Sequence, residues 1–163
     1  MKNIALLSDT HGFLEDRFLK HLSNVDEIWH AGDIGSIEII DKLKKYGVVK
    51  AVHGNIDDHV IKTEYKENIF FKCENIKILI RHIGGYPSKY TTASLALINK
   101  YKPDLFISGH SHILKVIYDK KYQLLHINPG AAGNYGIHKV KTIVKFSIRE
   151  DKILNLKIIE IKR

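Results

Sequence analysis

Five short polar clusters, each placed directly after an apolar run, are spread over the first 112 residues of the chain. They are Asp9-Thr10-His11, Gly32-Asp33, Gly54-Asn55-Ile56-Asp57, Arg81-His82 and Gly109-His110-Ser111-His112. Each preceding run has the length and apolar character of a buried strand. Because binding groups in an open α/β sheet collect beyond the carboxyl ends of its strands, clusters distant in sequence can meet at one edge. The pattern therefore predicts an α/β sheet with a polar site at its strand ends.

The clusters together offer two aspartates, one asparagine and four histidines as candidate metal ligands. These residues are Asp9, His11, Asp33, Asn55, His82, His110 and His112. Carboxylate, amide and imidazole groups all suit borderline divalent cations such as Mn, Fe, Co, Ni or Zn. Each cluster alone is a weak signal, since Gly-Asp is ordinary turn chemistry and single histidines are common on surfaces. Their joint order and placement carry the prediction.

The remaining pattern divides the chain into an alternating first half and a strand-rich second half. We predict helices at 14–22, 36–46 and 91–101, and strands at 2–8, 26–31, 47–53, 60–66, 69–73, 76–83, 104–108, 112–119, 121–127, 139–149 and 152–161. Ser36 can cap the second helix and Gly47 can end it. Alternating strands and helices indicate parallel βαβ units. We expect one domain over residues 1–163, with two mixed sheets packed together and helices outside.

Composition limits the classes of protein that the chain can represent. A 44% hydrophobic content predicts a globular core. No apolar run approaches the roughly 20 residues that span a bilayer, and we expect neither a membrane segment nor a signal peptide. A single cysteine, Cys73, fits a reducing cytoplasm. The net charge of +8 favours anionic partners, but the scattered lysines do not favour nucleic acid over a small substrate.

The ordered set D-x-H, G-D, G-N-x-D, H and G-H-x-H resembles the calcineurin-like metallophosphoesterases. Within that superfamily it is similar to the small bacterial and archaeal phosphodiesterases, a group that shares the fold of the retromer subunit. The resemblance runs from residue 3 to about residue 138 and includes Asn128-Pro129-Gly130. It implies a four-layer αββα sandwich of two mixed β-sheets flanked by helices.

The resemblance also implies two divalent metal ions per chain. Asp9, His11 and His112 would hold one ion, and Asn55, His82 and His110 the other, with Asp33 bridging them. Manganese is favoured, with nickel, cobalt, zinc, iron or magnesium as alternatives. Two ions about 3.5–4 Å apart can share a hydroxide that attacks a phosphate ester in line. The implied catalytic residues are Asp33, Asn55, His82 and His110.

One departure from the family pattern concerns the position after Gly54-Asn55. Many larger relatives carry a histidine there, whereas this chain has Ile56, which cannot act as a general acid. We expect a phosphoesterase, preferably a phosphodiesterase, acting on a phosphate-ester small molecule or a nucleotide-derived substrate. The alternatives are a non-catalytic metal-binding scaffold for protein interaction and a nuclease acting on short nucleic acids. A homo-oligomer remains open, because edge strands can pair.

Further polar residues near the clusters are candidates for supporting roles. Arg81, Tyr86, Lys89, Asn134 and His138 could hold a phosphate or its leaving group, and ordinary surface roles are as plausible for each. His30 could orient a ligand. Asp57 is predicted to fix the Gly54-Asn55 turn. His53 and His59 could approach the metals, whereas His21, His126 and Cys73 are expected to be structural.

Overall fold

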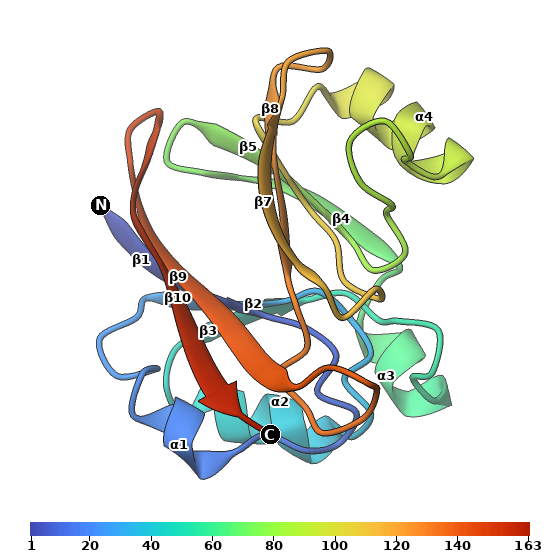
Figure 1. Ribbon diagram of the computed structural model, residues 1–163. Helices are drawn as coiled ribbons and strands as arrows, with labels where there is room; N and C mark the ends of the chain where they lie inside the picture. Colours follow the sequence, from blue (N-terminus) through green and yellow to red (C-terminus); the bar gives the residue numbers. More distant parts are fainter.

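One sheet contains the three parallel strands that open the chain. The computed structural model describes residues 1–163. The strands of this sheet are β1 (Lys2–Leu7), β2 (Glu27–His30), β3 (Val48–Ala51), β9 (Val140–Arg149) and β10 (Lys152–Lys162), in the order β10-β9-β1-β2-β3 (Figure 1). β1 pairs with β2 and β2 with β3 in parallel, whereas β9 runs antiparallel to both β1 and β10. The sheet is therefore mixed, with its parallel strands on one side.

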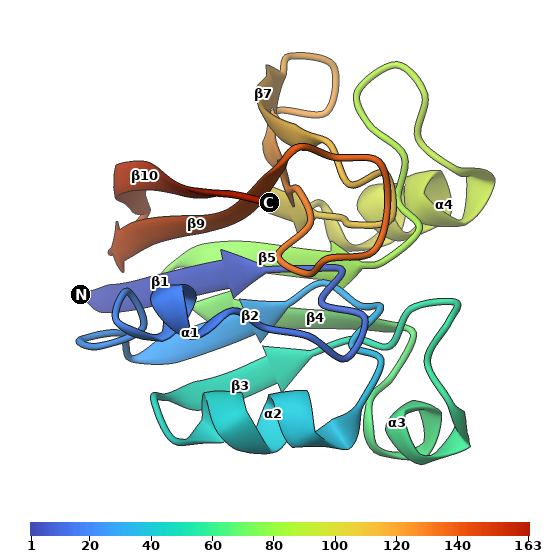
Figure 2. The same ribbon diagram turned by 60° about the horizontal axis from the view of Figure 1, so that its bottom comes forward.

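The second sheet is built from the middle of the chain. Its strands are β4 (Asn68–Cys73), β5 (Ile76–Arg81), β6 (Leu105–Ile107), β7 (Leu114–Asp119) and β8 (Leu124–Pro129), in the order β4-β5-β6-β8-β7. β5, β6 and β8 are parallel, and the two edge strands are antiparallel to their neighbours. Figure 2 shows β1, β2, β3 and β5 pointing the same way, toward the side where the connecting loops gather.

Alternation within β1 explains why the two sheets pack against each other. Ile4 and Leu6 lie in the core between the sheets, together with Trp29, Ile78 and Ile107. Ala5 and Leu7 point to the opposite face and pack beneath the helices. Successive side chains of a strand face opposite sides, so β1 is buried on both faces. The predicted α/β arrangement of two mixed sheets with outer helices is confirmed.

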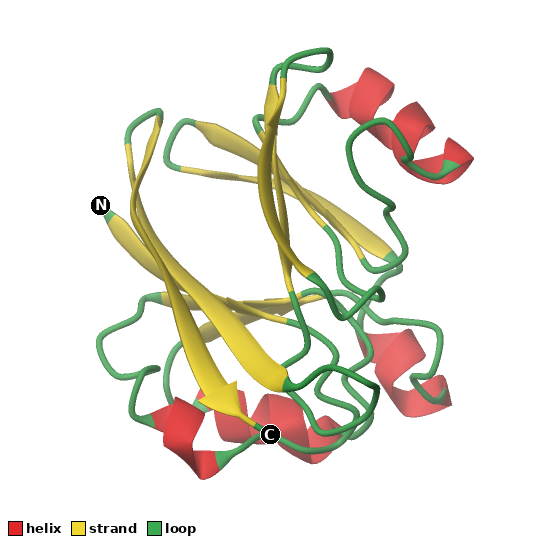
Figure 3. Ribbon diagram, in the orientation of Figure 1, coloured by secondary structure: helices red, strands yellow, loops and turns green.

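Four helices lie outside the sheets: α1 (Asp16–Leu19), α2 (Ile37–Lys44), α3 (His59–Glu64) and α4 (Thr92–Tyr101). Figure 3 shows them in red beside the two yellow sheets. The Ser36 side chain accepts a hydrogen bond from the Glu38 amide and caps α2, as predicted. Thr91 caps α4 by accepting from the Ser94 amide. No helix in the structure has the length and apolar content needed to cross a membrane.

Two local predictions from the sequence are wrong. Residues 60–66 were expected to form a strand, but α3 covers most of them because Asp58 caps its start, accepting a hydrogen bond from the Ile61 amide at 3.0 Å. The helix predicted at 14–22 is reduced to the four residues of α1. Glu15 provides no side-chain cap there, and the chain continues in turns, with the Leu22 amide bonded to the Leu19 carbonyl.

Candidate metal centre

The predicted ligands follow five parallel strands and lie at one edge of the molecule. Asp9 and His11 follow β1, Asp33 follows β2, and Asn55 follows β3 of the first sheet. His82 follows β5 and the His110–His112 loop follows β6 of the second sheet. The two sheets share this edge, so the seven side chains come from both of them. The structure thus brings together every residue that the sequence placed in the site.

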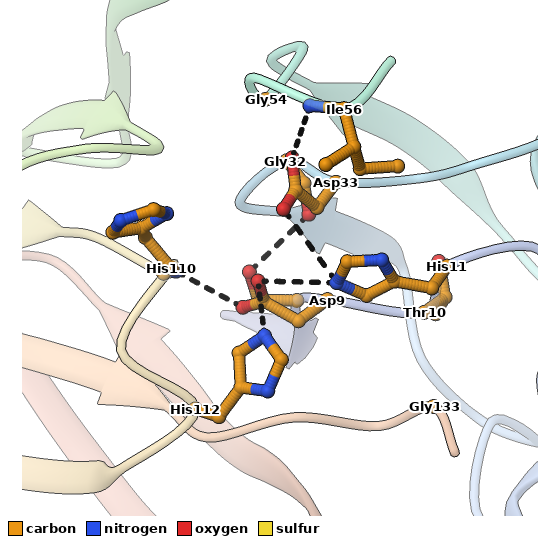
Figure 4. A network of polar contacts seen from close by, with 12 residues as sticks. Asp9, Thr10, His11, Gly32, Asp33, Gly54, Ile56, His110, His112 and Gly133 are labelled. Atoms are coloured by element: carbon orange, nitrogen blue, oxygen red, sulfur yellow. Dashed lines mark hydrogen bonds and ion pairs between the residues drawn. The ribbon is translucent and has the colours of Figure 1, made fainter. Parts of the chain in front are cut away.

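Asp9, His11 and His112 form the first group of candidate ligands. Their ligand atoms all lie within 4.8 Å of one another. The His112 Nε2 atom is 3.2 Å from the Asp9 Oδ1 atom, and the His11 Nε2 atom is 4.0 Å from it. Figure 4 shows both imidazoles turned toward the Asp9 carboxylate. This arrangement leaves one position that all three side chains face.

Asp33, His82 and His110 form the second group, again with ligand atoms within 4.8 Å. The amide oxygen of Asn55 joins them, since its Oδ1 atom lies 3.1 Å from the His110 Nδ1 atom. Ligands of one first-row cation bind at about 2.0–2.2 Å and therefore lie roughly 3 Å apart. The spacing of Asn55 and His110 is consistent with two ligands of the same ion.

Asp33 lies between the two groups. Its Oδ2 atom is 3.2 Å from the His82 Nε2 atom of the second group and 3.5 Å from the His11 Nε2 atom of the first. Its other oxygen, Oδ1, accepts a hydrogen bond from the Ile56 amide at 3.1 Å (Figure 4). The Asp33 side chain is only 3% exposed. A carboxylate held in this way can offer one oxygen to cations on both sides.

Three buried polar atoms at the centre of the site have no hydrogen-bond partner: Asp9 Oδ1, His11 Nε2 and His82 Nε2. Buried polar atoms are nearly always hydrogen-bonded, because an unsatisfied group loses its hydration without compensation. The Asp9 Oδ1 atom lies 4.0 Å from His11 Nε2 and 3.9 Å from His82 Nε2, so the three atoms are close to one another. Imidazole nitrogens and carboxylate oxygens are also the donors that borderline divalent cations prefer. The residues present therefore fit a metal centre.

Neighbouring groups shift the pKa values of these ligands. Burial alone would raise the pKa of Asp33, but the close approach of the His82 imidazole and the imidazole charges bring the pKa below its usual value. Burial alone would lower the pKa of His82, yet Asp33 and the charge of Asp9 raise it. Burial dominates at His11 and lowers its pKa. Protons and a cation compete for these atoms, so metal affinity should fall at acidic pH.

Five of the seven predicted ligands have a left-handed backbone conformation. The φ angles are +55° at Asp9, +46° at His11, +53° at Asp33, +69° at His110 and +59° at His112. Such angles are uncommon outside glycine and cost free energy at each residue. Strained backbone gathers at functional sites, where the surrounding structure imposes it.

Hydrogen bonds around the site hold the ligand rings in place. The His82 Nδ1 atom donates to the Ala31 carbonyl oxygen at 2.7 Å, which leaves the Nε2 lone pair directed at Asp33. The His110 amide donates to the Asp9 Oδ2 atom at 3.1 Å. Asn128 donates to the Gly109 carbonyl oxygen at 2.8 Å and braces the loop that carries both histidines. The sequence offered Asn128 only as part of a motif and gave no signal for this bracing.

His30 and Asp57 hold the loops that carry the predicted ligands in place through hydrogen bonds. Asp57 accepts hydrogen bonds from the Gly54 and Gly35 amides, both at 2.7 Å, which confirms its predicted role in the turn. His30 accepts from the Gly32 amide through Nδ1 at 3.2 Å, and its Nε2 atom lies 2.9 Å from the Thr10 hydroxyl. His30 is fully buried, and burial lowers its pKa to about 4. It therefore acts as a neutral linker between the loops that follow β1 and β2.

The other predicted polar residues are dispersed around the site. His53 lies beside Asn55 but outside both ligand groups, and exposed His59 begins α3. The Asn134 side chain accepts from Lys141, and the His138 Nε2 atom donates to the Gly133 carbonyl oxygen. Tyr86 lies beneath Lys115, and Lys89 is exposed. Sequence reasoning overlooked Tyr135, whose ring lies 4.7 Å from that of His11.

Exposed apolar side chains surround the ligands. Ile56 follows Asn55 and is 45% exposed, Ile83 follows His82, and Ile113 follows His112. Tyr135 and Ile137, on the loop beside His11 and His112, are also exposed. A charged centre with an apolar rim can receive a phosphate together with the organic groups attached to it.

Comparisons with known proteins agree with this geometry. The family model described as the calcineurin-like phosphoesterase superfamily domain matches residues 1–151. A probable metallophosphoesterase of Methanocaldococcus jannaschii is 34% identical over 156 residues, covering 92% of this chain and 77% of that protein. A second probable metallophosphoesterase, from Methanothermobacter thermautotrophicus, is 28% identical over 78% of this chain and 76% of its own length.

Solved structures share the fold at lower sequence identity. Vps29 from Entamoeba histolytica in complex with Zn²⁺ aligns with a TM-score of 0.77 at 20% identity, covering 98% of both chains. A predicted phosphoesterase from Streptococcus pneumoniae aligns with a TM-score of 0.72 at 18% identity, over 99% of this chain and 98% of that one. At these identities the likeness shows the common fold alone.

Proposed function

The chain belongs to the calcineurin-like phosphoesterase superfamily, and we propose that this metal-dependent phosphoesterase hydrolyses phosphodiesters at a two-metal centre. Water adds at phosphorus, one P–O bond breaks, and the products are a phosphomonoester and an alcohol. When bound, two divalent ions supply Lewis acidity to the phosphate and lower the pKa of a shared water. The seven residues described above would hold them, and manganese is the ion that we favour.

The position of Asp33 is the observation that carries this proposal. Its Oδ2 atom faces an imidazole of each ligand group, while the Ile56 amide holds the other oxygen. A single metal would require only one of these groups. The orphaned nitrogens of His11 and His82 both lie within 3.5 Å of the same Asp33 oxygen and support a pair of ions.

The charge of the ligand set favours an anionic substrate. Asp9 and Asp33 are the carboxylates in the two groups, and the other members are neutral when they bind metal. Two carboxylates offset half of the charge of two divalent ions, so the loaded site keeps a net positive charge. A phosphodiester anion is thereby attracted and oriented.

Ile56 restricts the leaving group. The residue after Asn55 is apolar and 45% exposed, so it cannot protonate a departing alkoxide. General acids contribute roughly 10²–10⁴-fold to such steps. We therefore expect faster hydrolysis of diesters with acidic leaving groups, and the apolar rim that includes Ile83 and Ile113 supports substrates with two organic substituents.

The decisive experiment combines metal reconstitution with the Asp33→Asn variant. Chelator-treated protein is assayed with Mn, Ni, Co, Zn or Mg on bis(p-nitrophenyl) phosphate, a diester, and on p-nitrophenyl phosphate, a monoester. We expect metal-dependent cleavage that favours the diester and is lost in Asp33→Asn, together with loss of metal binding. Asp41→Asn, an exposed site on α2, is the matched control. Full metal occupancy and activity in Asp33→Asn would refute the two-metal assignment.

Metal binding without hydrolysis of any ester would instead favour the non-catalytic scaffold. Such a protein would use the same ligand set to bind a partner, and the metal would have a structural role. Isothermal titration calorimetry with Mn²⁺ shows whether the metal is bound when no ester is cleaved, because it reports binding independently of turnover.

Hydrolysis of short nucleic acids is a second candidate, supported by a basic groove beside the His11 loop. The groove has a volume of about 710 Å³ and contains Arg17, Lys42, Lys141, Lys162 and Arg163. Glu15 and Asp16 pair with three of these cations, which reduces the charge available to phosphates. Oligonucleotide affinity that falls steeply with salt would support this candidate.

A further inference from the structure

A second cavity adjoins the candidate metal centre on the side of α3 and β5. It has a volume of about 300 Å³, and its wall includes Asn55 and His82, two of the predicted ligands. We call it the side pocket. A group bound there would lie next to a phosphate held at the metals, within the reach of one substituent of that phosphate.

The side pocket is positively charged. Lys62, on α3, forms no ion pair within the chain and is exposed. Arg81, at the end of β5, has a side chain that is only 13% exposed and donates to the Glu67 carboxylate at 2.7 Å. Glu67 is the single acidic residue of the wall. One carboxylate therefore faces two full cations.

His53 adds a further polar atom to the wall. Its Nδ1 atom donates to the Gly54 carbonyl oxygen at 3.1 Å, so its Nε2 atom remains free to interact with a ligand. Arg81 is also fixed at its base, where its Nε atom donates to the Ile83 carbonyl oxygen at 3.3 Å. A guanidinium held in this way presents its donors to the cavity with little further loss of side-chain freedom.

A purely structural role explains only part of this arrangement. The Arg81–Glu67 pair could simply join β5 to the segment before β4, but Glu67 is 60% exposed, and such pairs contribute little to stability. Lys62 has no such role. Occupation of the neighbouring metal centre would place divalent cations beside Lys62 and Arg81, and the resulting repulsion is relieved when an anion enters the pocket.

We propose that the side pocket binds a terminal phosphate carried by one substituent of the substrate. The proposal rests on the proposed phosphodiesterase function and specifies its substrate class as small diesters with an additional phosphomonoester group. A volume of about 300 Å³ is at the low end for ligand sites and matches one phosphorylated sugar-sized unit. Scission then occurs at the diester over the metals, while the terminal phosphate is bound by Lys62 and Arg81.

Competition against a chromogenic diester tests this proposal. Dithymidine monophosphate is compared with its forms that carry an added 5′- or 3′-terminal phosphate, each as an inhibitor of bis(p-nitrophenyl) phosphate cleavage by the manganese-loaded protein. Hydrogen bonds to charged groups justify an effect of roughly tenfold or more. We expect at least one phosphorylated form to have an inhibition constant at least tenfold lower than that of the parent dinucleotide.

Two variants attribute this preference to the side pocket. Lys62→Gln and Arg81→Gln should bring the ratio of inhibition constants close to one, whereas Lys45→Gln, an exposed lysine outside the pocket, should preserve it. Lys62 is exposed, so its variant keeps the test valid if Arg81→Gln destabilises the fold. Equal inhibition by all forms, or a preference for the phosphorylated form that persists in both variants, would overturn the side-pocket proposal. Neither result would contradict the proposed phosphodiesterase function. Absence of any diester cleavage would refute the proposed function itself.

Discussion

Gly54→Ala should disable the metal centre without altering any ligand. A Cβ atom at position 54 would lie 2.8 Å from the Asp33 Cγ atom and closer still to its Oδ1 atom and backbone nitrogen. Asp33 cannot retreat easily, because the Ile56 amide donates to its side chain and its carbonyl oxygen accepts from the His11 amide. The φ angle of Gly54 is not in the left-handed region, so alanine brings steric overlap without backbone strain.

The magnitude follows from overpacking and from displacement of the Asp33 carboxylate, which we propose bridges the two ions. Forcing a methyl group into a packed interior costs about 1–3 kcal/mol of unfolding free energy. Displacement of groups that orient ligands costs about 10–100-fold in metal affinity or activity. Urea unfolding of the metal-free protein measures the first effect, and calorimetric titration with Mn²⁺ measures the second.

Gly47→Ala is the matched control, because its added Cβ atom would lie 3.2 Å from the Asp26 carbonyl oxygen, far from any predicted ligand. We expect it to keep metal affinity. If Gly54→Ala binds Mn²⁺ as tightly as the wild type, Asp33 does not need its observed position, and the reasoning from the Asp33–Gly54 contact is wrong.

Three further predictions concern pH, metal removal and the missing acid. Burial, followed by the charge of Lys115, lowers the pKa of fully buried His126 from 6.5 to about 4. Between these pH values the unfolded chain binds a proton that the folded chain does not. The unfolding free energy should therefore fall by up to about 3 kcal/mol as the pH drops from 6.5 to 4. His126→Phe should flatten this part of the stability profile in urea titrations, and an identical slope in wild type and variant would contradict the assignment. Adding Mn²⁺ at 100 times its Kd to chelator-treated protein should stabilise it by about 2.7 kcal/mol, which raises Tm by roughly 5–10 °C in calorimetry; a Tm indifferent to Mn²⁺ would argue against a specific site. Ile56→His should accelerate diesters with alkyl leaving groups by up to about 10²-fold relative to aryl ones, with Val60→His on α3 as the control, and an unchanged alkyl-to-aryl ratio would show that position 56 does not reach the leaving group.

The parallel part of the fold could be predicted because each of its buried strands contains an apolar run in the sequence. Runs such as Ile4–Leu7 and Leu105–Ile107 are apolar over their whole length, which marks strands covered on both faces. The prediction of a strand at 60–66 was wrong because Val60 and Ile61 are residues typical of strands. The opposing signal for a helix is a single residue, the capping Asp58. Local capping decided the outcome there, with only Ile61 buried to anchor the helix.

The clustering of the predicted ligands could also be read from the sequence, since placement after parallel strands brings these residues to one edge of the sheets. The contacts that hold the ligands were less accessible. Ala31 acts on His82 through a carbonyl oxygen, and the approach of Gly54 to Asp33 depends on the absence of a side chain. Neither contact produces a pattern that can be recognised in the sequence. The side pocket likewise depends on Lys62, Glu67 and Arg81 meeting across α3, the segment before β4 and the end of β5, which only the folded chain specifies.

The left-handed backbone at the predicted metal ligands also bears on how this protein can evolve. Glycine is the residue that adopts such conformations without steric penalty, so Asp9, His11, Asp33, His110 and His112 occupy positions where the ligand is locally disfavoured. A population selected for thermal stability in the absence of metal would be free to exchange these residues for glycine. Selection that requires metal binding would prevent such exchanges. The predicted ligands can thus be lost before the fold is lost. A descendant without them would retain both sheets but would no longer bind metal at the strand ends.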